Sequence, residues 1–154
     1  MKIYRLCKEE EIKNILYSKS FENTGNYFYI NNSVNNHKYK RNVKYLHFFS
    51  DINDVMFMSP EKGMYIYEIN MDSSTLEKYF GYGYYSDLLL YSRYRYIKEY
   101  AIDKSILNIN DLYAVYKVIR EITKKDYIEK NISFCIENIN YENKTYVKTK
   151  KYRK

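Results

Sequence analysis

The stretch from Tyr79 to Asp103 constrains this chain most, because a glycine-containing aromatic segment is followed by a clearly alternating one. Two of the four glycines stand in the sequence GYGYY, and residues 94–102 then alternate as a β-strand does. The alternation places Glu99 on a strand face with mostly apolar neighbours. A half-buried carboxylate beside a glycine-containing aromatic loop is a candidate reactive group, since burial and positioned partners tune it. The alternative is that Glu99 pairs with Arg95 or Lys98 at an exposed edge.

The remaining segments predict one α+β domain with a split, mixed β-sheet and short helices. The asparagine-rich part of residues 18–44 is expected to form a loop. Residues 112–118 fit a strand but also part of a helix, and we favour the strand. The domain covers residues 1–143, and a basic tail covers residues 144–154. Strands are expected at residues 2–7, 43–49, 63–70, 94–102, 112–118 and 131–139, and helices at 8–17, 51–56 and 74–80.

Length and composition limit the classes of protein that this chain can represent. With 154 residues the chain can bury a core without disulfides or metals. Its 22 tyrosines are matched by many Asn, Lys and Ile residues, as AT-rich coding favours, so they are weak evidence for a binding surface. Cys7 and Cys135 lack metal-ligand spacing, and we expect no metal site and no disulfide. No apolar run of about 18 residues or signal peptide is present, so we expect a cytoplasmic protein and no membrane contact.

Positive charge is concentrated at the carboxyl end. The net charge is +7, but residues 144–154 hold six of the 26 basic residues and no acid, which leaves 20 basic against 19 acidic residues elsewhere. A nucleic-acid partner would therefore meet mainly this tail. A second group of basic residues lies in the asparagine-rich loop. The alternative is that the loop and the tail are simply solvated segments. The candidate nucleic-acid-binding residues are Lys38, Lys40 and Arg41 in the loop, and Lys148, Lys150 and Lys151 in the tail.

Two further residues occupy positions that invite a functional interpretation. Arg5 lies in the first predicted strand, where it is either a surface residue or a clamp for an anion, because its planar fork can hold a phosphate or carboxylate with two hydrogen bonds. His47 lies in the apolar strand that ends in HFFS. A lone histidine in such a strand is ordinarily a core residue with satisfied ring nitrogens.

The order of these signals resembles the ADP-ribosyltransferase fold, a split mixed sheet that clamps NAD in its central cleft. The resemblance covers roughly residues 3–118 and consists of the opening IYRLC, the strand ending in HFF, the YEI strand, the GYGY loop and KEYAI. It implies that Arg5 contacts the dinucleotide. It also implies that Glu99 is the catalytic residue, which stabilises positive charge on the nicotinamide ribose as nicotinamide leaves.

The resemblance also implies candidate cofactor-binding residues beyond Arg5. One of the tyrosines in the GYGYY segment would stack on the nicotinamide ring. The Ser-Thr-Ser strand of the cholera-toxin-like group is missing from this chain, and HFFS, which begins at His47, is only a loose counterpart. NAD would be consumed as a substrate, and no metal is implied. The candidate residues for NAD are Arg5, His47, Tyr82, Tyr84 and Tyr85.

One departure from the family pattern bears on the acceptor. The cholera-toxin-like group has a second acid two residues before the catalytic glutamate, where this chain has Ile97. That acid helps to engage an arginine acceptor, so its absence argues against arginine as the target. A nucleic acid, another protein side chain or NAD hydrolysis itself remains, and a nucleic-acid acceptor fits the basic segments.

Two classes of function therefore follow. The first is an NAD-dependent ADP-ribosyltransferase of a toxin or a phage-related effector, whose partners would be a host target protein or nucleic acid and a neutralising antitoxin. The second is a binding module without turnover, which would occupy a nucleic acid or a protein such as a host defence nuclease. The first predicts nicotinamide release that depends on Glu99, and the second predicts salt-sensitive binding that depends on the tail.

Overall fold

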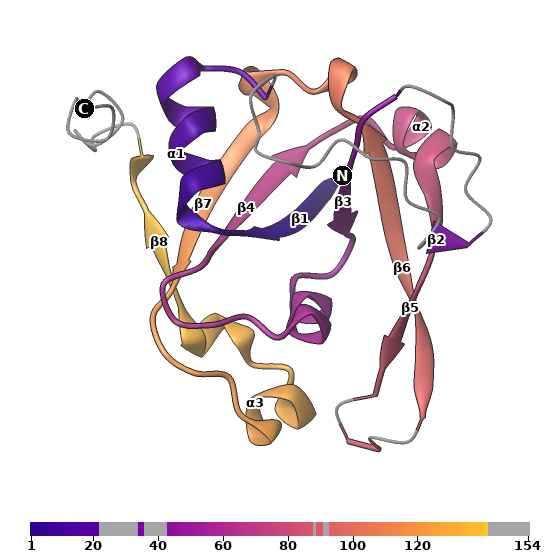
Figure 1. Ribbon diagram of the computed structural model, residues 1–154, viewed down its shortest axis with the longest axis vertical. Coiled ribbons are helices and arrows are strands. Elements are labelled where there is room, and N and C mark those ends of the chain that lie inside the picture. Colours follow the sequence, from indigo (N-terminus) through magenta and orange to yellow (C-terminus); the bar gives the residue numbers. More distant parts are fainter. Residues whose placement is uncertain (22–33, 36–42, 88, 91–92, 142–154) are drawn as a thin grey trace.

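An eight-stranded sheet, flanked by short helices, organises the computed structural model (Figure 1). The structure describes residues 1–21, 34–35, 43–87, 89–90 and 93–141. The strand order is β2-β5-β6-β3-β1-β4-β7-β8. The elements are β1 (Lys2–Cys7), α1 (Glu9–Ser18), β2 (Val34–Asn35), β3 (Tyr45–Phe49), the 3₁₀ helix η1 (Ile52–Met58), β4 (Tyr65–Asn70), α2 (Ser73–Leu76), η2 (Glu77–Tyr79), β5 (Phe80–Ser86), β6 (Tyr94–Asp103), η3 (Lys104–Ile106), η4 (Ile109–Asp111), β7 (Leu112–Val118), α3 (Lys124–Glu129), η5 (Ile132–Cys135) and β8 (Ile136–Ile139).

The α+β class is confirmed, but the expectation of a mixed sheet is wrong for the described strands. Every strand pair among them is antiparallel. The strand predicted at residues 112–118 is confirmed as β7. The last predicted strand is shorter than expected, because η5 occupies its first part and β8 begins only at Ile136.

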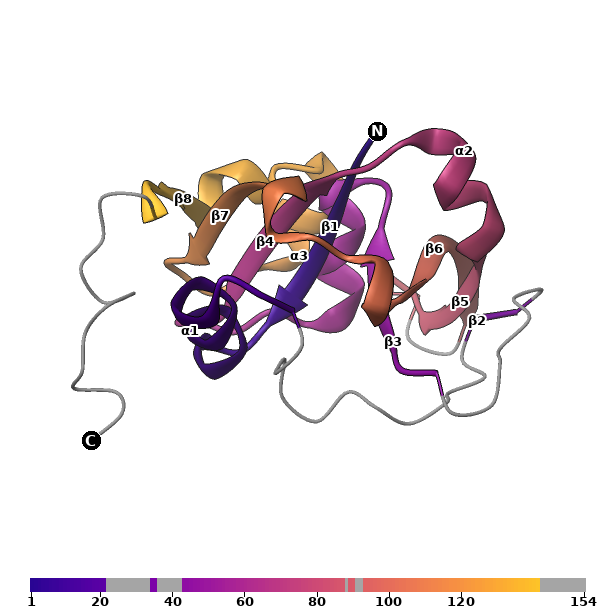
Figure 2. The same ribbon diagram turned by 90° about the horizontal axis from the view of Figure 1, so that it is seen from above.

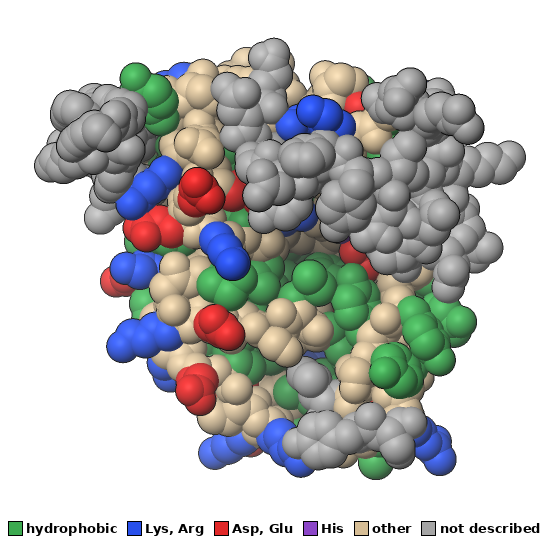
Figure 3. Space-filling model, viewed as in Figure 1, with side chains coloured by type: hydrophobic (Ala, Val, Ile, Leu, Met, Phe, Trp, Pro, Cys, Tyr) green, Lys and Arg blue, Asp and Glu red, His purple; other side chains and the backbone are tan. Residues whose placement is uncertain are grey.

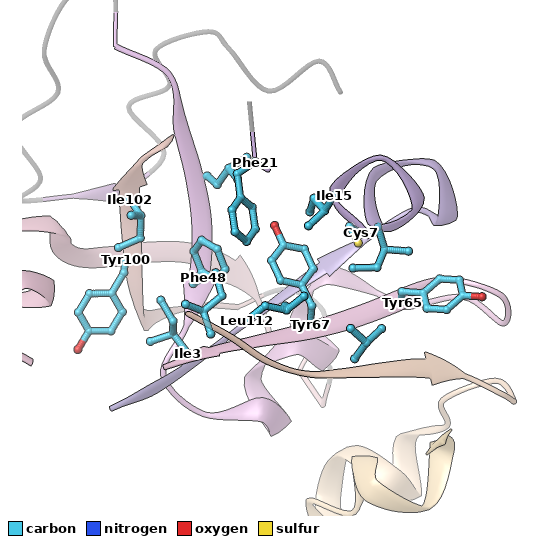
Figure 4. Packing of buried hydrophobic residues seen from close by; sticks show 14 of the residues in the cluster. Ile3, Cys7, Ile15, Phe21, Phe48, Tyr65, Tyr67, Tyr100, Ile102 and Leu112 are labelled. Atoms are coloured by element: carbon cyan, nitrogen blue, oxygen red, sulfur yellow. The ribbon is translucent and has the colours of Figure 1, made fainter. Parts of the chain in front are cut away.

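The two faces of the sheet are covered by different helices. Ile12, Ile15 and Leu16 of α1 pack on one face, together with Phe48 of β3 and Tyr67 of β4 (Figure 4). The other face packs against η1, α3 and η5, and Figure 2 shows α1 and α3 on opposite sides of β4. We call these the α1 face and the α3 face. Side-chain alternation along each strand then decides which face a residue joins.

The segment predicted as a glycine-containing loop is instead the regular strand β5. Residues 80–86 pair along their whole length with β6, from Phe80 opposite Tyr100 to Ser86 opposite Tyr94. The local sequence favoured a loop because glycine weakens strands. In the structure, β6 provides hydrogen-bonding partners for the backbone of this segment, which therefore forms a strand. The two strands extend from the sheet as a long hairpin (Figure 1).

Several predictions fall outside the part of the chain that the structure describes. They concern the asparagine-rich loop and the tail, including Lys38, Lys40, Arg41, Lys148, Lys150 and Lys151. Within the described residues, Cys7 and Cys135 are both free and buried. None of the described helices has the length and apolarity that crossing a bilayer requires.

Candidate active site

Glu99 lies inside the sheet, on the α3 face. Its strand β6 runs between β5 and β3, and Glu99 stands opposite Gly81 of β5 and Phe49 of β3. The residue is only 2% exposed. Lys98 is exposed and, by alternation, belongs to the α1 face. The alternative that Glu99 forms an ion pair at an exposed sheet edge is therefore wrong.

Two side chains from neighbouring strands hold the Glu99 carboxylate. The hydroxyl of Tyr85, on β5, donates to Oε1 at 2.6 Å. Nδ1 of His47, on β3, lies 3.1 Å from Oε2 and donates when it carries its proton. Each carboxylate oxygen thus has its own partner, which fixes the orientation of the group. We refer to Glu99, Tyr85 and His47 as the Glu99 cluster.

Glycine at position 83 is what leaves room for this cluster. A Cβ atom there would overlap both Oε1 of Glu99 and the ring of Tyr85. The backbone of β5 can therefore approach the carboxylate closely only because residue 83 has no side chain. The role of Gly83 was not predicted from the sequence, because it depends on the pairing of β5 with β6.

Arg5 does not join the Glu99 cluster. Tyr4 pairs with Phe49, and Phe49 pairs with Glu99, so these three share the α3 face and Arg5 points to the α1 face. There Arg5 is 7% exposed, and its Nε and Nη2 donate to the two carboxylate oxygens of Glu11 at 2.8 and 3.1 Å. The expected convergence of Arg5 and Glu99 on one cleft is not found.

The buried pair of Arg5 and Glu11 is part of a larger polar network. The hydroxyl of Tyr67 donates to Oε2 of Glu11 at 2.9 Å. Burial, reinforced by the Glu11 carboxylate, raises the pKa of Tyr67 well above its ordinary value, so that Tyr67 remains a donor. Nη1 of Arg5 also donates to the backbone carbonyl of His47 at 3.3 Å. Arg5 therefore supports the strand that presents His47 rather than facing Glu99.

The three candidate tyrosines of β5 separate between the two faces. Tyr85 joins Glu99, whereas Tyr82 and Tyr84 lie on the α1 face with the even-numbered residues of β6. Tyr84 is 54% exposed, and its ring lies 4.9 Å from that of Tyr94 and 4.8 Å from that of Tyr96, centre to centre. We call Tyr84, Tyr94 and Tyr96 the tyrosine ladder.

The described residues contain no group of three or more His, Cys, Asp or Glu side chains that could hold a metal ion. A fixed carboxylate can stabilise developing positive charge or accept a proton, and a histidine and a tyrosine beside it can relay protons.

The fold and the site together define an α+β protein with an antiparallel sheet and a buried glutamate held by a histidine and a tyrosine. Comparison of the chain with family models, with curated proteins and with solved structures finds no match.

Proposed function

We propose that this protein is an NAD-dependent ADP-ribosyltransferase in which Glu99 is the catalytic residue. The observation that supports the proposal best is the Glu99 cluster: a 2% exposed carboxylate with a separate partner for each oxygen, in a position that Gly83 keeps open. Groups fixed in this way are typical of catalytic sites, because little reorganisation is needed during the reaction.

The reaction would break the bond between the nicotinamide nitrogen and C1′ of the ribose. The electron pair of that bond leaves with nicotinamide, and the ribose gains oxocarbenium character, which the negative charge of Glu99 stabilises. An acceptor hydroxyl or amine then forms a bond to C1′ and loses a proton. The acceptor is a nucleic acid or a protein side chain, or water in simple hydrolysis. His47 and Tyr85 act by orienting the carboxylate.

Burial of Glu99 sets a structural requirement for this proposal. A ribose can reach the carboxylate only if a neighbouring group moves when the substrate enters. Tyr85 is the nearest group that could do so, since it is only partly buried and lies on the outer hairpin. Such movement is common in enzymes whose sites close around a substrate. In this scheme Arg5 is a positioning residue and makes no contact with NAD.

The proposal is tested by incubating the purified protein with NAD carrying a labelled ADP-ribose moiety and cell extract. Release of nicotinamide and transfer of label to a macromolecule are expected, and both should disappear in Glu99→Gln. Glu68→Gln is a matched control, because Glu68 is 3% exposed and accepts a hydrogen bond from the Tyr116 hydroxyl at 3.0 Å. Activity that is absent from the wild type with every acceptor, or unchanged in Glu99→Gln, would overturn the proposal.

The tyrosine ladder favours a second candidate function, which is binding of single-stranded nucleic acid without turnover. The three tyrosine residues are each more than half exposed, and Lys98 lies on the same face of β6. Figure 3 shows hydrophobic side chains gathered over the part of the surface where β5 and β6 lie. Exposed aromatic rings beside a cation are a sequence-tolerant platform on which bases stack.

This second candidate predicts salt-dependent affinity for a short single-stranded oligonucleotide. Tyr84→Ala and Tyr96→Ala should each weaken binding, by roughly 1–3 kcal/mol for a lost base stack. Phe134→Ala is the control, since Phe134 is an exposed aromatic residue of η5, outside the ladder. Equal losses in all three variants, or affinity that is independent of salt, would count against the ladder as a binding surface.

A further inference from the structure

A pocket of about 190 Å³ lies on the α3 face, and its lining includes no member of the Glu99 cluster. It is formed by η1, by the first residues of β6 and by α3 with its C-cap, and in Figure 1 α3 and the distal end of the hairpin lie at the same end of the molecule. Pockets for drug-sized ligands measure roughly 300–1,000 Å³, so this one suits a single ring system. The residues that the argument uses are Asp54, Phe57, Arg95, Tyr127 and Lys130.

Asp54 is the most unusual group in this pocket. Within the described part of the chain, its carboxylate makes no side-chain hydrogen bond or ion pair. Burial and the nearby Asp51 raise the pKa of Asp54 to about 6, although Arg95 and Lys130 act in the opposite direction. A partly desolvated carboxylate without a partner, in a concave site, favours a ligand that donates hydrogen bonds to it.

The walls of the pocket are aromatic, and contacts among the lining side chains hold them in place. The rings of Phe57 and Tyr127 meet edge to face, with centroids 5.3 Å apart. Nη1 of Arg95 donates to the Tyr127 hydroxyl at 3.0 Å, and its guanidinium carbon lies 5.7 Å from the centre of the Phe57 ring. These contacts hold the walls in place before any ligand arrives, which lowers the entropic cost of binding.

The charges around the pocket limit the class of ligand. An anionic group placed against Asp54 would be repelled, and a cationic group would meet Arg95 and Lys130. A neutral planar ring that carries N–H donors avoids both penalties, and it can pack against aromatic walls. A phosphate attached to such a ring could then lie at the exposed rim, where Lys130 is solvent-accessible and Arg95 has a 53% exposed side chain.

We propose that this pocket binds the base of a guanine nucleotide, with the Asp54 carboxylate accepting both N–H groups of the guanine edge and Lys130 and Arg95 facing the phosphate. Guanine is preferred because its ring N–H and its amino group donate side by side, as two carboxylate oxygens require, whereas adenine offers a single amino donor on that edge. The proposal is independent of the chemistry at Glu99. Its ligand is either a free nucleotide or a guanosine within a single strand.

The test is titration of the whole protein with GMP, with AMP, and with single-stranded oligonucleotides that differ at one guanine, followed by calorimetry. GMP or the guanine-containing oligonucleotide should bind at least about tenfold more tightly than its counterpart, since a charge-assisted pair of hydrogen bonds is lost with adenine. Asp54→Asn should remove this preference, whereas Asp111→Asn, outside the pocket, should keep it. Thermal unfolding confirms that both variants are folded, and Lys130→Gln provides a second, exposed variant that should weaken GMP binding.

The pH dependence of binding adds a separate readout. The charged groups that act on Asp54 are Asp51, Arg95 and Lys130. Because the guanine edge needs an unprotonated carboxylate, affinity should be full at neutral pH and decline as the pH falls through about 6. Binding of GMP identifies a free nucleotide as the ligand. Binding of the oligonucleotide but not of GMP identifies a single-stranded nucleic acid. Absence of both, equal affinity for guanine and adenine, or affinity unchanged in Asp54→Asn overturns the proposal.

Discussion

Arg5 shows how the neighbours of a single residue decide its role. Its guanidinium is buried against the Glu11 carboxylate, and its remaining amino group reaches the backbone of β3 at His47. A buried charge pair contributes little net stability, but removing one partner leaves the other charge without compensation. Loss of Arg5 should therefore lower the stability of the folded protein.

Arg5→Ala should lower the free energy of unfolding by about 3–5 kcal/mol, because the Glu11 carboxylate then remains buried and unpaired. Chemical denaturation of the variant and of Lys13→Ala, which removes the cation of a more exposed pair on α1, measures the difference. Lys13→Ala should change stability by less than about 1 kcal/mol. Similar small effects in both variants would contradict the assigned role of Arg5.

Tyr116 gives the sheet a predictable response to alkaline pH. Burial and its hydrogen bond to Glu68 raise the pKa of Tyr116 to about 12, from an ordinary value of 10. Since the folded state keeps the proton more tightly, the stabilisation is complete below pH 10 and is lost as the pH rises from 10 to 12. Tyr116→Phe should show a shallower loss of stability over this range in unfolding experiments. Tyr113→Phe, which alters an exposed tyrosine of the same strand, should keep the slope of the wild type.

At the scale of elements, the hairpin of β5 and β6 presents different chemistry on its two sides. The α3 face holds Glu99 and Gly83, which gives it room, and the α1 face holds the tyrosine ladder. Residues one position apart thus serve different surfaces, as Tyr84 and Tyr85 do. A shift of one residue in the pairing would exchange the two sides, so the register of this hairpin defines the site.

Gly83→Ala tests that close packing directly. The added Cβ would overlap the Glu99 carboxylate and the Tyr85 ring, so the variant should lose roughly 1–3 kcal/mol of stability and displace the Tyr85 hydroxyl from Glu99. Gly63→Ala is the comparison, because its φ of 96° strains an alanine while no atom lies within 4 Å of the added carbon. A change in the environment of Tyr85, followed by NMR, should appear only in Gly83→Ala.

The sequence predicted individual strands better than their partners. The alternation in residues 65–70 and 112–118 is a local property of the chain, and β4 and β7 appear where it indicates. It also placed Glu99 correctly among apolar neighbours. Whether Arg5 lies on the same face as Glu99 depends on two strand registers, Tyr4 with Phe49 and Phe49 with Glu99, and local patterns do not contain them. The pocket around Asp54 could not be predicted either, because its lining comes from segments far apart in the chain.

At the scale of the whole molecule, the sheet separates two environments. Its α1 face is closed by α1 and stabilised by the network of Arg5, Glu11 and Tyr67. Its α3 face holds the Glu99 cluster and the pocket around Asp54. They are near one another, since the Tyr85 ring lies 6.2 Å from that of Phe57, which lines the pocket. We expect function to reside on this face.

The most direct test of the proposed function is nicotinamide release from NAD by the wild type, Glu99→Gln and Glu68→Gln, each first shown by thermal unfolding to be folded. The wild type and Glu68→Gln should release nicotinamide and Glu99→Gln should not, because only Glu99 would stabilise the positive charge of the ribose. No release by the folded wild type in the presence of cell extract, or equal release by the two variants, would contradict it.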